Sequence, residues 1–96
     1  MNPHKGSSLR SLFEELGEWD EVEALTAKKI IAETLRREMI RQKITKSVMA
    51  KHMKTSRSQL DAILDPNDPG LTIVSLSRAS FALGLRPEIR FKAREK

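Results

Sequence analysis

The stretch from Ile44 to Leu64 reads ITKSVMAKHMKTSRSQLDAIL and contains two short helical patterns that are joined by three residues. In the first pattern, Thr45 is a residue type that caps helices, and the apolar residues after it recur at the spacing of one helix face. That face consists of Met49, Ala50 and Met53. The pattern therefore predicts a short helix that buries a narrow stripe.

The second pattern begins with the spacing of a capping box, in which Ser56 caps a helix and Gln59 reaches back to it. Its buried stripe is predicted to be Leu60, Ile63 and Leu64. Because Ala50 is small, the two helices can cross closely at a steep angle. This combination is typical of a helix-turn-helix.

The remaining residues of both helices are left for the surface. Arg57, Ser58, Asp61 and Ala62 are expected to face outward from the second helix, whereas Lys46, Lys51 and Lys54 face solvent or phosphate. A helix-turn-helix places its second helix in the major groove of DNA. The pattern thus favours double-stranded DNA as the partner.

The segment resembles the Cro/C1-type (XRE) helix-turn-helix family through Ile44, Thr45, Met49, Ala50, Met53, Ser56 and Leu60. The resemblance implies that the bases are read by Ser56, Arg57, Ser58 and Ala62. It implies contacts to the DNA backbone from Thr45, Lys46, Lys51, Lys54 and Gln59. The family usually has Gly in the turn, where this chain has Lys54, and a left-handed lysine costs about 1 kcal/mol relative to Gly.

Length and composition limit the alternatives. A chain of 96 residues predicts one domain with a compact core. It contains no cysteine, which excludes disulfides and zinc-thiolate sites. No apolar run has the roughly 20 residues of a membrane helix, and residues 1–10 lack the apolar core of a signal peptide. We therefore expect a cytoplasmic protein without a membrane partner.

Charge is distributed unevenly along the chain. The formal net charge is +5, but residues 1–26 carry −4, residues 27–60 carry +8 and residues 61–96 carry +1. The basic charge thus coincides with the predicted helix-turn-helix and the helix before it, as a phosphate-binding surface requires. A lysine-rich helix that is merely solvated remains the alternative.

Residues 1–26 are expected to form an acidic helical extension to a DNA-binding domain at residues 27–84. An apolar stripe at Leu9, Leu12, Phe13 and Leu16 predicts a short helix that ends at Gly17. A cap at Asp20 begins a long helix to about Gln42, whose apolar positions are Val22, Leu25, Ile30, Ile31, Leu35 and Met39. Together with Glu14 and Glu15, the first stripe suits a basic protein partner, and completion of the domain's own core is the alternative.

The C-terminal part is predicted to contain a loop, a helix and a tail with a short β-strand. Residues 65–70, DPNDPG, predict a loop, after which Thr72 caps a helix that Gly84 ends. Its inward positions are predicted to be Ile73, Leu76, Ala79, Ser80 and Leu83. From residue 85 to 96 we expect a tail with a short β-strand, whose apolar face includes Leu85, Ile89 and Phe91. Because one strand leaves its backbone unpaired, we expect it to pair across a homodimer axis, although a loosely packed tail is the alternative.

The resemblance extends over nearly the whole chain. GSS at residues 6–8, LFEELG at 12–17, EVEA at 21–24, MAKHMKTSRSQLDAILDP at 49–66 and ALGL before the strand are similar to small regulators related to HigA-type antitoxins. The resemblance implies an all-α, lambda-repressor-like fold of about five helices with the short C-terminal strand. It also implies autorepression at an inverted-repeat operator and a HigB-type toxin as partner.

An enzyme is not expected. His4 and His52 have no second ligand or base at a fixed spacing, so no catalytic residue, metal site or cofactor is predicted. Glu14, Glu15 and Glu18 lack an apolar pocket that would raise a carboxyl pKa. With only four aromatic residues, the chain is poorly suited to stacking on RNA. Two functions remain: a repressor that reads DNA, and a protein-interaction module that neutralises a small basic toxin.

Overall fold

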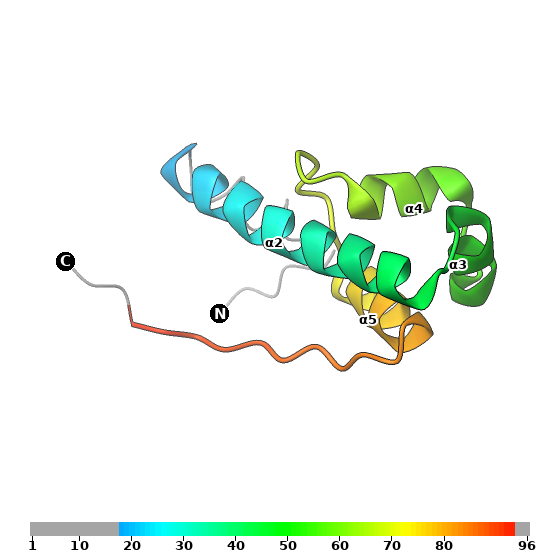
Figure 1. Cartoon of the computed structure of the whole chain (residues 1–96). Helices are drawn as coiled ribbons and strands as arrows, with labels where there is room; N and C mark the ends of the chain where they lie inside the picture. Colours follow the sequence, from blue (N-terminus) through cyan, green and yellow to red (C-terminus); the bar gives the residue numbers. More distant parts are fainter. Residues whose placement is uncertain (1–17, 94–96) are drawn as a thin grey trace.

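The computed structural model describes residues 18–93, and the fold in this range is all-helical (Figure 1). Four helices follow one another: α2 at Glu18–Gln42, α3 at Lys46–Met53, α4 at Arg57–Leu64 and α5 at Ile73–Ala82. The long helix α2, about 37 Å at 1.5 Å per residue, runs along the molecule and packs on α4, while α3 packs on both α4 and α5. No helix between residues 18 and 93 is both long enough and apolar enough to cross a bilayer.

Three predicted caps are confirmed. Thr45 Oγ1 accepts from Val48 N at 3.2 Å, Ser56 Oγ from Gln59 N at 3.0 Å, and Thr72 Oγ1 from Ser75 N at 3.0 Å. Each cap satisfies a backbone donor that has no partner inside its own helix. The helix starts in the second half of the chain are therefore set by local chemistry. The long helix begins at Glu18, two residues before its predicted cap.

The core lies where α2, α3, α4 and α5 meet. Its buried members are Leu35, Met39, Met49, Ala50, Met53, Leu60, Ile63, Leu64, Leu71, Ala79 and Leu83. The predicted apolar stripes of α3 and α4 are confirmed, since all three residues of each stripe are buried. Ala50 is 6% exposed at the α3–α4 contact, as the close crossing requires.

Two predicted stripes are partly wrong. In α2, Val22 and Ile30 are 57% and 60% exposed, and in α5 Ile73 is 43% exposed. The first half of α2 instead buries Ala24, Lys28 and Ala32. Small side chains let this part of α2 approach α4 and the loop after it, so the larger apolar residues face away.

Lys28 is the largest side chain that is fully buried. Its ammonium donates to the carbonyl oxygens of Ala62 and Asp65 at 3.0 Å each and of Asp68 at 2.5 Å. These carbonyls belong to the end of α4 and the loop after it, where a helix leaves acceptors without partners. Burial lowers the pKa of Lys28, and the charges of Asp68 and Asp65 oppose this shift.

Two further side chains of α2 satisfy carbonyls at helix ends. Arg36 Nε donates to Leu64 O of α4 at 3.0 Å, and Gln42 Nε2 donates to Leu83 O after α5 at 2.8 Å. The long helix thus orients α4 and α5 through hydrogen bonds as well as through apolar contacts.

The turns that follow α2 and α3 each contain a left-handed lysine. Lys43 has φ 58°, and Lys54 has φ 56°. Ile44 N bonds to Met39 O at 2.9 Å and Thr55 N to Ala50 O at 3.0 Å, which are the six-to-one bonds of a Schellman motif. Lys54 therefore adopts the left-handed conformation that glycine adopts most readily in such a turn.

Residues 85–93 form no β-strand in the single chain. They run as an extended tail back along α2 (Figure 1), and Leu85, Pro87 and Ile89 line a hollow with Ile30 and Ile31. The strand was expected to need a second chain, because an isolated strand leaves its hydrogen-bonding groups unpaired.

Candidate nucleic-acid interface

The outer face of α4 is polar and open to solvent. Its inner face is buried in the core, whereas Ser56, Arg57 and Ser58 are exposed at its start. Ala62, the fourth predicted base-reading residue, is half-buried. Three of the four predicted residues therefore lie together on one accessible helix end.

Arg57 is positioned by the first turn of α3. Its Nη1 lies 3.4 Å from Ser47 Oγ, although the two residues are ten positions apart in the sequence. This weak hydrogen bond aims the guanidinium across the gap between the two helices and leaves most of its five donors free. Ser47 could not be identified from the sequence, because its pairing with Arg57 depends on the angle at which α3 crosses α4.

Lys46 forms a second link between the two helices. Its Nζ lies 3.0 Å from Asp61 Oδ1, and the two side chains are 42% and 52% exposed. The hydrogen bond from Lys46 lowers the pKa of Asp61 and outweighs the opposing effect of burial, and the positive charges of Lys46, Arg57 and Arg36 lower the pKa further. The predicted backbone contact at Lys46 is therefore shared with a carboxylate on the same surface.

The other predicted backbone contacts divide between the two ends of α3. Thr45 is exposed at its start beside Lys46, and Gln59 is exposed on α4. Lys51 and Lys54 are exposed at the opposite end of α3. Lys54 lies in the turn that leads into α4, three positions before Arg57, and Lys46 at the other end of α3 contacts α4 through its ion pair, so both ends of α3 lie near α4.

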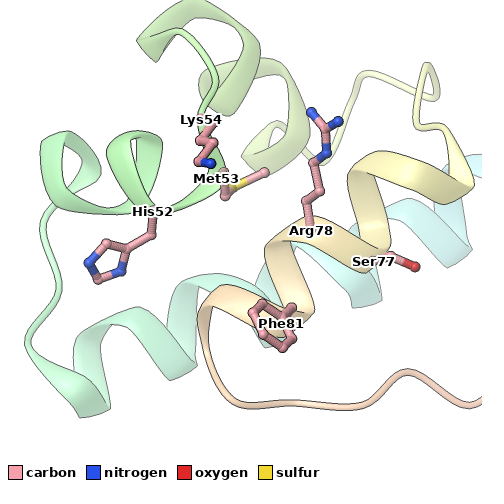
Figure 2. A pocket seen from close by; sticks show the side chains of 6 residues that line it. All are labelled: His52, Met53, Lys54, Ser77, Arg78 and Phe81. Atoms are coloured by element: carbon pink, nitrogen blue, oxygen red, sulfur yellow. The ribbon is translucent and has the colours of Figure 1, made fainter.

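A basic hollow of about 500 Å³ lies where the end of α3 faces α5. It is lined by His52, Met53, Lys54, Ser77, Arg78 and Phe81. Figure 2 shows the Lys54 and Arg78 side chains near Met53, with the Phe81 ring below them on α5. Arg78 was missed by the sequence analysis, since α5 carries no other basic residue that would mark a charged face.

The predicted dimerisation residues differ in their surroundings. Leu85 is half-buried against the core of its own chain, whereas Ile89 and Phe91 are 59% and 95% exposed. The predicted partner-binding residues Leu9, Leu12, Phe13, Glu14 and Glu15 lie outside the described residues. Between residues 18 and 93, no three His, Asp or Glu side chains are arranged to hold a metal ion.

No protein-family model matches the chain, and comparisons with curated proteins and with solved structures gave no significant match. The exposed start of α4 carries Arg57, serine hydroxyls and nearby lysines, and these groups can donate hydrogen bonds to phosphates and to base edges.

Proposed function

We propose that this protein is a sequence-specific DNA-binding regulator in which α3 and α4 act as a lambda-repressor-like helix-turn-helix. The observation that carries the proposal is the exposed, arginine-bearing outer face at the start of α4, whose opposite face is buried in the core. A helix held in this way can enter the major groove without loss of its own packing.

Three properties of the surface support this function. The guanidinium of Arg57 has the two-donor edge that matches guanine O6 and N7. Thr45 and Lys46 lie at the start of α3, where a helix end attracts a phosphate, and residues 27–60 carry a net charge of +8. A positive face of this kind supplies the sequence-independent part of DNA affinity.

The regulator is proposed to act as a homodimeric repressor on an inverted repeat. Two copies related by a two-fold axis would place their α4 helices about 34 Å apart, one turn of DNA. Ile89 and Phe91 are apolar side chains that the single chain leaves exposed, and burying them between two tails would stabilise such a dimer.

The experiment is a fluorescence-anisotropy titration with labelled duplex DNA from upstream of the gene and with a shuffled duplex of equal length. We expect the upstream duplex to bind at least about a thousandfold more tightly at physiological salt, which is the low end of the range for specific regulators. Equal affinity for both duplexes at every salt concentration would contradict the proposal.

A second function is favoured by the charge of residues 1–26, which is −4 and opposite in sign to the rest of the chain. An acidic segment with an apolar stripe suits a small basic protein, such as the HigB-type toxin implied by the resemblance. Co-expression with the neighbouring open reading frame tests this role. Stable co-purification that is lost when Glu14 and Glu15 are both changed to lysine would support an antitoxin, and co-purification that survives the change would exclude this segment as the contact.

A further inference from the structure

Asp61 is an acidic residue on the surface that the proposed function places against DNA. It lies four positions after Arg57 in α4, one helical turn further along the same face. Its side chain is 52% exposed, and the apolar side of α4 is buried behind it. A carboxylate in this position repels phosphates, so its presence calls for a specific reason.

The ion pair with Lys46 determines which carboxylate oxygen of Asp61 is available to a ligand. Lys46 Nζ meets Oδ1 at 3.0 Å, which leaves Oδ2 able to accept a hydrogen bond. Three cations act on Asp61, namely Lys46, Arg57 and Arg36, and they favour its ionised form. An ionised carboxylate accepts hydrogen bonds and donates none.

We propose that Asp61 determines specificity by accepting a hydrogen bond from the N4 amino group of a cytosine, next to the guanine contacted by Arg57. In the major groove, cytosine presents only an amino donor, adenine presents its amino donor beside the acceptor N7, and guanine O6 and N7 and thymine O4 are acceptors. A carboxylate is repelled by acceptors, so cytosine suits it best. Lys46 holds the carboxylate in position from α3 and reaches toward the phosphate beside it. This inference rests on the proposed function and adds to it a base-reading residue that is not among the four predicted from the sequence.

The test is a selection from a random-sequence duplex library with the intact wild-type chain, followed by binding of the selected duplex and its single-base variants. Asp61→Asn is compared with Glu88→Gln, which removes the same charge from an exposed ion pair on the tail, where Glu88 meets Arg90 at 3.4 Å. We expect Asp61→Asn to reduce discrimination for cytosine at one base pair by about 5- to 150-fold and to bind random DNA more tightly. Glu88→Gln should leave the discrimination unchanged.

Lys46→Gln tests whether Asp61 reads a base or only links α4 to α3 through its ion pair with Lys46. It breaks the ion pair that positions the carboxylate but keeps the carboxylate itself, so cytosine discrimination should fall by much less than in Asp61→Asn, while affinity for all DNA falls. If Asp61→Asn and Lys46→Gln change discrimination equally, or if Asp61→Asn leaves it unchanged, Asp61 only holds Lys46 and the inference is overturned. If the wild-type chain selects no sequence at all, the proposed function itself fails. Thermal melts of each variant establish that it is folded.

Discussion

Lys28 joins α2 to the end of α4 through three carbonyl oxygens that come from residues 34 to 40 positions later in the chain. A buried ammonium is costly unless its donors are used, and here each of its three protons has an acceptor. The apolar stem of the side chain contributes to the packing while its head closes the helix end. Lys28 therefore attaches the loop at residues 65–70 to α2, while hydrogen bonds from Asn67 N to Asp65 Oδ1 and from Gly70 N to Asp68 Oδ1 stabilise the loop itself.

The first prediction concerns Lys28→Met, which keeps the stem and removes the donors. We expect the free energy of unfolding to fall by about 1–3 kcal/mol at pH 7, because buried carbonyls lose their partner. Denaturant unfolding followed by circular dichroism measures the change. Lys29→Met, at an exposed neighbour, is the matched control and should change stability by less than about 0.5 kcal/mol.

The pH dependence of this difference has a definite sign. Burial lowers the pKa of Lys28 in the folded chain below its value of 10.5 in the unfolded chain. Between these two values the unfolded chain binds more protons, so the stability of the wild type rises with pH relative to Lys28→Met. The gap between the two proteins should widen from pH 7 to pH 10. A gap that narrows would mean that Asp65 and Asp68 outweigh burial.

Lys54 provides the second prediction, since a side chain in the left-handed region carries steric strain. Lys54→Gly relieves this strain, which is worth about 1 kcal/mol, and the greater freedom of glycine in the unfolded chain offsets part of that gain. We therefore expect a net rise in the free energy of unfolding of up to about 1 kcal/mol. Lys54→Ala removes the same charge but keeps the strain, so it should not be stabilised. Equal stabilisation of both variants would assign the effect to charge instead.

The short helices α3 and α4 were predictable because their signals are local. Thr45 and Ser56 lie where caps are needed, and Met49 and Leu60 repeat with their neighbours at helical spacing. The buried face of α2 was harder to predict, because its sequence contains apolar residues on more than one side. Which side is buried depends on the loop that Lys28 meets 40 residues later, and no local pattern contains that information.

In the candidate interface, too, some features follow from local sequence signals and others depend on how the helices pack. Exposure of Arg57 and Ser58 follows from the buried stripe on the other side of α4, and the sequence predicts it. The pairs Arg57–Ser47 and Lys46–Asp61 could not be predicted, since they depend on the angle at which α3 crosses α4.

The third prediction concerns phosphate contacts on α3. Lys51→Ala and Lys46→Ala should each weaken binding to every DNA sequence and reduce the slope of log K against log salt by about 0.9, because one fewer counterion is released per contact. Lys29→Ala, on the exposed side of α2, serves as the control with an unchanged slope. Titrations at four salt concentrations give the slopes, and an unchanged slope for Lys51→Ala would remove that residue from the interface.

Assembly of the whole molecule is proposed to depend on the C-terminal tail. Truncation after Arg86 keeps Leu85, which packs on the core, and removes Ile89 and Phe91, which are exposed. We expect the truncated chain to stay folded, to sediment as a monomer and to lose its preference for an inverted repeat. A truncated chain that still sediments as a dimer would place the interface elsewhere, with the outer face of α5 and its exposed Phe81 the next surface to mutate.

Arg57→Ala tests whether the start of α4 reads DNA bases. Affinities for the duplex selected by the wild type and for a shuffled duplex are measured at one salt concentration, with Arg86→Ala on the tail as a control for loss of an exposed arginine. We expect Arg57→Ala to lose about 1–3 kcal/mol on the selected duplex and much less on the shuffled one. Equal losses on both duplexes would show that Arg57 contacts only phosphate, and base reading at this position would be refuted.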